Sequence, residues 1–341
     1  MKAAVIEKAN KIIVTDKPIP SLEAGEALIK VKYCGICGTD IHILQGRHST
    51  AVFPNIPGHE FIGELVDIKG KLAAAFKPGD LVVGQTVINC GICDACMKGS
   101  PNVCESLKIL GIHVDGSFAE YVKVLADKLV KVPEDIDLEL ASMAEPLAVA
   151  VHDVRKSGLK AGEKALIIGG GPIGLLNAIV CRLTGASSVV VSEPSENRRD
   201  FIDKMGFITV DPFADDFEDR LKESTGGKAF DVSFEAAGAP GSLSTCLQYT
   251  KPTGAVVVIA VPAQEYPINT FNILSKELTL IGVRIHTMYD FKSAAEIVAG
   301  GVIDNELRSM ISRVFAFDEI LAAFEYAQTD KTAFKTLVKI I

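Results

Sequence analysis

The sequence has no excess of positive charge. Its 341 residues contain 35 Lys and Arg against 43 Asp and Glu, a formal net charge of -8, and the longest basic cluster is the pair Arg198-Arg199. Nucleic acids and anionic membrane surfaces are bound by basic patches. We therefore expect neither a nucleic-acid partner nor a membrane partner. We expect the ligand to be a small molecule.

Long hydrophobic runs are missing as well. The apolar run 165–180 is interrupted by glycines and a proline, and the run 255–261 is too short to span a bilayer. The first residues, MKAAVIEKAN, lack the apolar core and the small-residue cleavage site of a signal peptide. We expect a soluble, cytoplasmic chain, long enough to form two domains.

The cysteines are distributed unevenly. Four of the eight lie close together: Cys90, Cys93, Cys96 and Cys104. Four soft ligands in a short loop are typical of a closed, structural zinc site. Two disulfides are the alternative, but strained geometry and a reducing compartment both disfavour them. The spacing therefore predicts a structural zinc ion in the segment 90–104.

The pattern of apolar segments changes along the chain. Early segments such as 27–31, 61–68 and 81–87 are separated by Gly and Pro, which predicts a β-rich part. After residue 161 the runs 164–169, 188–192, 230–234, 255–260 and 278–283 alternate with helical stretches. Strands that alternate with helices predict a parallel, doubly wound sheet. The stretch from about His286 reads as helix, strand, helix, strand, and we assign it to the first domain.

A glycine motif follows the first strand of this series. Gly169, Gly171 and Gly174 fit the G-x-G-x-x-G pattern, with Pro172 and Ile173 between the last two. This pattern lets backbone amides and a helix N-terminus bind the pyrophosphate of a dinucleotide. The segment therefore predicts a nicotinamide cofactor.

The next strand ends at Glu193, where a carboxylate accepts hydrogen bonds from the 2′-hydroxyl of NAD and repels the 2′-phosphate of NADP. The alternative is that Glu193 is only an acidic loop residue that follows a strand. Arg198 and Arg199 favour a phosphate when taken alone, but they more readily begin a helix, with one of them packing on the adenine. We expect NAD in preference to NADP, and include Arg198 in the cofactor site.

Three further residues offer ligands for a metal but are dispersed: Cys37, His59 and Glu60, with Glu145 as an addition. Cys37 also forms a C-x-x-C pair with Cys34, as in redox motifs, and His59 also fits a hydrogen-bonded core histidine. Spacing alone leaves these alternatives open.

Resemblance to a known family bears on this choice. The segments Gly35-Ile36-Cys37-Gly38-Thr39-Asp40-Ile41-His42 and Gly58-His59-Glu60-Phe61-Ile62-Gly63, the spacing of the four clustered cysteines and the position of the glycine motif together resemble the zinc-containing medium-chain alcohol dehydrogenases. These four motifs occur in the same order as in the family, and the resemblance covers essentially the whole chain. The resemblance implies an α/β protein with a GroES-like β-rich catalytic domain and a Rossmann cofactor domain.

The resemblance also implies roles for individual residues. Cys37 and His59 would bind a catalytic zinc, with Glu60 as an adjacent or exchangeable ligand. No cysteine lies between Cys104 and Cys181, so the second cysteine of many alcohol dehydrogenases is absent. Ala144-Glu145-Pro146-Leu147 instead resembles the polyol (sorbitol-type) branch, which places Glu145 at the zinc, directly or through water. Thr39 and His42 resemble the family's proton relay.

These observations predict a zinc-dependent dehydrogenase that transfers a hydride from a secondary alcohol, such as a polyol or sugar acid, to NAD. We expect two zinc ions per chain and a homodimer or homotetramer. The expected domains are 1–147 with 286–341, which includes the zinc lobe at 90–104, and 148–285. L-threonine or butanediol dehydrogenase is the alternative within the enzyme class, and a non-catalytic, zinc-stabilised NAD-binding sensor is the alternative outside it. A zinc-free quinone reductase of the same superfamily would not need Cys37, His59 or the four cysteines.

Overall fold

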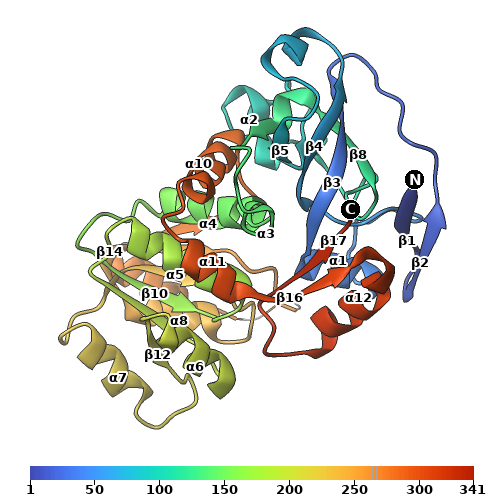
Figure 1. Ribbon diagram of the computed structural model, residues 1–341. Coiled ribbons are helices and arrows are strands. Elements are labelled where there is room, and N and C mark those ends of the chain that lie inside the picture. Colours follow the sequence, from blue (N-terminus) through green and yellow to red (C-terminus); the bar gives the residue numbers. More distant parts are fainter. Residues whose placement is uncertain (263, 266) are drawn as a thin grey trace. The chain divides into compact units, whose positions relative to one another are not determined.

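The computed structural model describes residues 1–262, 264–265 and 267–341. Contacts along the chain divide it into two units, Met1–Ala148 with Thr287–Ile341, and Val149–His286. Figure 1 shows the path of the chain through both units. Among the described residues, no helix combines the length and apolar character needed to cross a bilayer.

The first unit is built on a seven-stranded sheet in which β16, β17, β3, β4, β5 and β9 follow one another and β8 also pairs with β3. All pairs are antiparallel except β16 with β17. The strands are β3 (Glu26–Ile36), β4 (Glu60–Ile68), β5 (Leu81–Gly84), β8 (Tyr121–Leu125), β9 (Leu129–Lys131), β16 (Ile311–Ala316) and β17 (Lys335–Lys339). A separate hairpin consists of β1 (Lys2–Lys8) and β2 (Lys11–Asp16).

The helices of the first unit are mostly short. They are α1 (Gly38–Leu44), α2 (Asp94–Met97), α3 (Leu138–Ala141), α10 (Met288–Ala299), α11 (Asp304–Met310) and α12 (Ile320–Thr329), with 3-10 turns at Lys71–Ala75, Pro101–Val103, Ala126–Lys128 and Phe317–Glu319. Helix α4 (Ala144–Ser157) begins in this unit and continues into the second.

Two details of the first unit differ from the sequence prediction. The expected strand 81–87 is divided, because β5 ends at Gly84 and β6 (Val87–Ile88) pairs instead with β7 (Lys108–Ile109). This small ladder begins and ends the cysteine-containing lobe. The last stretch of the chain has two helices, α10 and α11, before β16, where one was expected. A turn at Gly300 and Gly301 ends α10 and separates the two helices.

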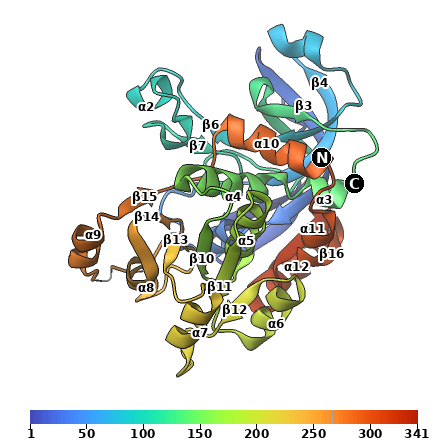
Figure 2. The same ribbon diagram turned by 90° about the vertical axis from the view of Figure 1, so that its left-hand side faces the viewer.

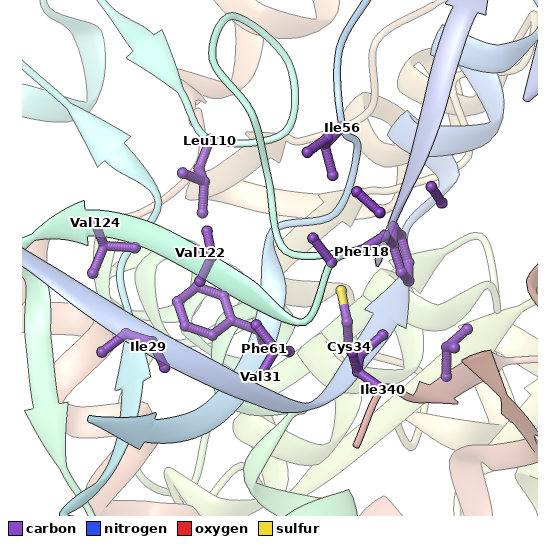
Figure 3. Packing of buried hydrophobic residues seen from close by; sticks show 14 of the residues in the cluster. Ile29, Val31, Cys34, Ile56, Phe61, Leu110, Phe118, Val122, Val124 and Ile340 are labelled. Carbon is purple, nitrogen blue, oxygen red and sulfur yellow. The ribbon is translucent and has the colours of Figure 1, made fainter. Parts of the chain in front are cut away.

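The core of the first unit lies between its sheet and the covering segments. Phe118 packs edge-to-face on Phe324 with ring centroids 5.4 Å apart. Cys34 of β3 is fully buried in this cluster, and its sulfur lies among apolar side chains (Figure 3). Its thiol is 3.2 Å from Oγ of Ser117. Cys34 is therefore a packing residue, and it forms no disulfide with Cys37.

The second unit contains a parallel six-stranded sheet in the order β12-β11-β10-β13-β14-β15. The expected doubly wound sheet is confirmed, because this order equals 3-2-1-4-5-6 in chain sequence. The strands are β10 (Lys164–Ile168), β11 (Ser188–Ser192), β12 (Ile208–Val210), β13 (Phe230–Glu235), β14 (Thr250–Val258) and β15 (Thr279–Gly282). The short β12 was missing from the predicted series, since a strand of this length leaves little periodicity to read.

The connecting helices of the second unit are α5 (Pro172–Leu183), α6 (Glu196–Lys204), α7 (Phe217–Ser224), α8 (Ser242–Tyr249) and α9 (Thr270–Lys276). Cys181 and Cys246 are buried in α5 and α8, as expected of packing residues. Figure 2 shows β15 and α9 at one end of this sheet and β12 with α6 at the other.

Candidate functional site

The glycine motif forms the turn between β10 and α5. Gly169 has φ = +104°, and an added Cβ would lie 2.9 Å from the backbone nitrogen of Ala237. A Cβ on Gly174 would lie 1.8 Å from the carbonyl oxygen of Gly169. Both positions therefore require glycine, one for the turn and one for close packing. Gly171 is the N-cap of α5 and Pro172 occupies its first turn, so the free amides of this helix end are available to an anion.

Glu193 follows β11 and is buried beside this turn. Its Oε2 accepts a hydrogen bond from the amide of Gly170 at 2.8 Å, and its Oε1 accepts one from the amide of Ser195 at 2.9 Å. The carboxylate thus connects the glycine turn to the start of α6. Each oxygen keeps a second lone pair for a hydroxyl donor.

The two arginines of α6 differ in their surroundings. Arg199 donates to the carbonyl oxygens of Glu193 and Pro194 and forms an ion pair with Asp211 at 3.1 Å. Arg198 lies next to the glycine turn, where its Nη1 is 4.0 Å from the position of a Cβ on Gly171. Arg199 therefore serves the local structure, and Arg198 is the arginine that borders the turn.

The four clustered cysteines converge in the lobe around α2. Their sulfur atoms all lie within 4.8 Å of one another. The Sγ–Sγ distances are 4.0 Å for Cys90–Cys96, 3.8 Å for Cys93–Cys104 and 3.5 Å for Cys104–Cys90. Zn–S bonds of about 2.3 Å in a tetrahedron place the sulfurs about 3.8 Å apart. The arrangement therefore fits a zinc ion, and no disulfide competes with it.

Backbone amides in the lobe point at the sulfurs. The amide of Cys90 donates to Sγ of Cys104 at 3.3 Å, and the amide of Cys93 donates to Sγ of Cys90 at 3.3 Å. The amides of Glu105 and Cys96 lower the pKa of Cys93 to about 6. Burial raises the pKa of Cys96 to about 11. Thiolates are the form in which cysteine binds zinc, so the amide contacts favour the metal-binding form at Cys93.

The dispersed residues also come together. Ligand atoms of Cys37, His59 and Glu60 lie within 4.8 Å of one another. Cys37 is the N-cap of α1, and Glu60 is the first residue of β4. Glu145, in the first turn of α4, is buried. Among the described residues, the group whose ligand atoms all lie within 4.8 Å of one another contains Cys37, His59 and Glu60 but not Glu145. Glu145 is nevertheless close enough for its charge to raise the pKa of His59.

Asp40 connects two of these residues, and the sequence reading gave it no role. It is fully buried and accepts hydrogen bonds from the amides of Cys37 at 2.9 Å and Gly58 at 3.1 Å. Its Oδ1 lies 3.6 Å from Nδ1 of His59. Burial alone lowers the pKa of His59, but the charges of Asp40 and Cys37 outweigh it and raise that pKa well above its usual value. Several buried anionic groups face one small volume, so the donor set suits a divalent cation.

Thr39 and His42 lie on α1, three residues apart and so on one face of the helix. Thr39 is half-buried and His42 is exposed. The helix thus leads from the neighbourhood of Cys37 toward solvent.

Comparison with known proteins shows the family to which the chain belongs. Residues 23–134 match the model of the alcohol dehydrogenase GroES-like domain, and residues 172–300 match that of the zinc-binding dehydrogenases. The chain is 40% identical over 318 residues to the 2-dehydro-3-deoxy-L-galactonate 5-dehydrogenase of Pseudoalteromonas atlantica, covering 93% of this chain and 92% of that protein. The chain belongs to the zinc-binding alcohol dehydrogenase family.

Two further similarities are informative. An L-threonine 3-dehydrogenase of Caldanaerobacter subterraneus is 35% identical over 332 residues, with 95% of each protein covered. A zinc-binding dehydrogenase of Sinorhizobium meliloti, whose crystal structure contains NADP, superimposes with a TM-score of 0.90 at 34% identity over 99% of both chains.

The expected α/β fold, with a GroES-like domain and a Rossmann-type cofactor domain, is confirmed. The expected type of reaction is also confirmed: the protein is a zinc-dependent oxidoreductase that transfers a hydride from a secondary alcohol to a nicotinamide cofactor.

Proposed function

We propose that this dehydrogenase oxidises a secondary hydroxyl of a sugar acid or related polyol to the ketone, with NAD as its preferred cofactor. The observation that carries the proposal is the convergence of Cys37, His59 and Glu60 within 4.8 Å in a chain of this family. The similarity to a sugar-acid 5-dehydrogenase at 40% identity supports the substrate class. The presence of Glu145 where many alcohol dehydrogenases have a cysteine supports a polyol-like substrate.

The proposed metal content is two zinc ions per chain. Cys37 and His59 hold the catalytic ion, Glu145 completes its ligands directly or through water, and Glu60 stands beside them. Cys90, Cys93, Cys96 and Cys104 hold the structural ion and leave no ligand position for a substrate. When bound, the catalytic zinc supplies Lewis acidity toward the alcohol oxygen, and the nicotinamide supplies the hydride acceptor.

The protein's own groups move the proton that leaves the alcohol. Thr39 sits one helical turn before His42 on α1, and we assign the pair to a relay that ends at His42. Partial desolvation of the ring and the charge of Arg47 both lower the pKa of His42. The imidazole of His42 is therefore neutral at neutral pH and able to accept a proton.

Cofactor binding is assigned to the glycine turn and to the residues that support it. The amides at the start of α5 receive the pyrophosphate, with Gly169, Gly171, Pro172, Ile173 and Gly174 forming the turn. Glu193 accepts the ribose 2′-hydroxyl. Arg199 is engaged by Asp211 and two carbonyl oxygens, which favours NAD, whereas Arg198 borders the turn and contacts the adenosine part.

The proposed catalytic and cofactor-binding residues also assign a function to each domain. We assign catalysis to 1–147 with 286–341 and cofactor binding to 148–285. The eight free cysteines favour a reducing compartment, and we propose a cytoplasmic location.

Assembly into a homodimer or homotetramer is proposed from an exposed edge of the second unit. Strand β15 ends the sheet order, so backbone groups along its outer side are available for a second copy. Phe271 and Leu274 of the adjoining α9 are 65% and 74% exposed. Exposed apolar side chains beside a strand edge fit a contact with another copy of this chain.

L-threonine is the second candidate substrate, because a relative at 35% identity is an L-threonine 3-dehydrogenase. The experiment is a screen of aldonates, polyols, threonine and diols with NAD and NADP side by side. The proposal expects the highest kcat/KM for a sugar acid or polyol with NAD, and threonine as the best substrate would overturn the substrate class.

The metal assignment is tested with Cys37→Ser, for which Cys34→Ser is a matched control. Cys37→Ser should retain about one zinc per chain instead of about two and lose turnover. Cys34→Ser should keep both ions. Full NAD-dependent activity in Cys37→Ser would overturn the catalytic assignment of Cys37, whereas binding of NAD by the wild type without turnover of any alcohol in the screen would favour a non-catalytic NAD-binding protein.

A further inference from the structure

Glu60 is held by a buried lysine from the other end of the chain. The Nζ of Lys335 lies 2.7 Å from Oε1 and 2.6 Å from Oε2 of Glu60, and it also donates to the carbonyl oxygen of Ile36 at 3.4 Å. The side chains of Lys335 and Glu60 are 4% and 1% exposed. Such a pair, cut off from water, is held firmly, because removing either partner leaves a buried charge uncompensated.

The ion pair of Glu60 and Lys335 crosses strand β3 at Gly35, which has no side chain. Glu60 on β4 is opposite Gly35 on β3, and Gly35 is opposite Leu337 on β17. A Cβ on Gly35 would lie 2.3 Å from Oε2 of Glu60. The carboxylate therefore occupies the space that any other residue at position 35 would fill.

The same carboxylate also borders the metal ligands, since one of its oxygens is within 4.8 Å of the ligand atoms of Cys37 and His59. Two cationic positions thus compete for it, the ammonium of Lys335 and the proposed catalytic zinc. Lys335 engages both oxygens of the carboxylate.

We propose that Lys335 is a positioning residue that, together with Gly35, holds the carboxylate of Glu60 away from the catalytic metal and so keeps open the position at which the alcohol oxygen binds. This inference rests on the proposed zinc site at Cys37 and His59. Without the ammonium, the buried carboxylate turns to the nearest remaining cation. The metal then has one more ligand, and the substrate must displace it.

The test uses Lys335→Met in the holoenzyme, with Co²⁺ in place of the catalytic zinc as a spectroscopic probe. A rise in coordination number weakens the visible absorption bands of Co²⁺, and we expect this loss of intensity in Lys335→Met. Release of zinc to a chelator should slow because one more ligand holds the ion, and we expect a factor on the order of ten, the size but not the direction of the affinity changes that outer partners of a metal site produce. KM for the alcohol should rise more than kcat falls.

The double variant Glu60→Gln with Lys335→Met separates positioning from a merely structural role. We expect it to recover the wild-type Co²⁺ spectrum and the wild-type rate of zinc release, because the mobile carboxylate is gone. Lys335→Arg should behave like the wild type. If Lys335→Met does not fold, Gly35→Ala tests the same point, because its methyl group displaces the end of the Glu60 side chain, and the same spectral change is expected.

An unchanged spectrum and rate in Lys335→Met, or in Gly35→Ala where that variant replaces it, would overturn the inference. So would an equal change in the single and the double variant. A failure of the proposed function shows elsewhere, as retention of both zinc ions by Cys37→Ser. The two failures are therefore distinguished by different variants.

Discussion

Oδ1 of Asp40 lies 3.6 Å from Nδ1 of His59. With Nδ1 facing the carboxylate, Nε2 is the ring nitrogen left for a metal. A carboxylate behind a ligating histidine fixes the orientation of the ring and raises its basicity. Because Asp40 also accepts from the amides of Cys37 and Gly58, one buried side chain helps to set the places of Cys37 and His59.

We expect Asp40→Asn to lower the affinity for the catalytic zinc by about 10- to 100-fold, with a parallel loss of turnover at limiting zinc. The amide keeps the volume but removes the charge that orients His59. Zinc content after dialysis against a graded chelator series measures the effect. Asp67→Asn, at an exposed position of β4, is the control, and equal zinc retention in the two variants would contradict the role of Asp40.

Cys93→Ser should reduce the zinc content from about two ions to about one per chain and leave the catalytic ion in place. The lobe has few buried apolar residues, so the ion is its main support, and we expect the thermal midpoint to fall on the order of 10 °C. Calorimetry and metal analysis check this. Cys246→Ala removes a buried thiol outside the lobe and should keep both ions; a Cys93→Ser protein with two zinc ions would disprove the structural site.

Glu193→Ala should raise KM for NAD by about 10- to 100-fold, because a hydrogen bond to a charged group contributes about 1.5–3 kcal/mol. KM for NADP should change less, since the carboxylate repels its 2′-phosphate. Steady-state kinetics with both cofactors measure the ratio, with the exposed Glu196→Ala as control. Equal weakening of both cofactors would mean that Glu193 only supports the turn through the amides of Gly170 and Ser195.

Arg47→Gln should shift the acid limb of the kcat profile to higher pH. Partial desolvation and the charge of Arg47 both lower the pKa of His42, so the neutral base persists to lower pH in the wild type. Removing the cation raises this pKa, and His42 then becomes protonated, and inactive as a base, at a higher pH. His42→Gln should remove the limb, and Lys108→Gln, at an exposed position of β7, should leave it unchanged. An acid limb identical in all three variants would rule out His42 as the relay terminus.

Local spacing was sufficient for part of this description. The cysteines of the lobe and the glycines of the turn each lie within fifteen residues, so a short loop must bring their atoms together. The run of apolar segments likewise predicted the parallel sheet, apart from the three residues of β12. Cys34 and Cys37 show the limit, because only the folded structure shows that Cys34 is buried near the end of β3 while Cys37 begins a helix.

Distant partners left no such signal. Lys335 and Glu60 are 275 positions apart, and an isolated lysine near the end of a chain is ordinary in composition. Asp40 stands three residues after Cys37, which is the spacing of a helix-capping carboxylate, so its contact with the Cys37 amide could be expected. Its contact with His59 could not, because that requires the packing of α1 against the start of β4.

The Glu60–Lys335 contact joins a strand that is synthesised early to one that is synthesised last. Strands β3 and β4 leave the ribosome early, but β17, which pairs with β3, follows only after the whole of Val149–His286. Until then the carboxylate of Glu60 has no ammonium to bind, and the neighbouring ligands belong to an incomplete sheet. In the nascent chain, the four cysteines proposed to bind the structural zinc are therefore complete long before the proposed catalytic site, and we expect the two ions to be loaded in two stages separated by translation of Val149–His286.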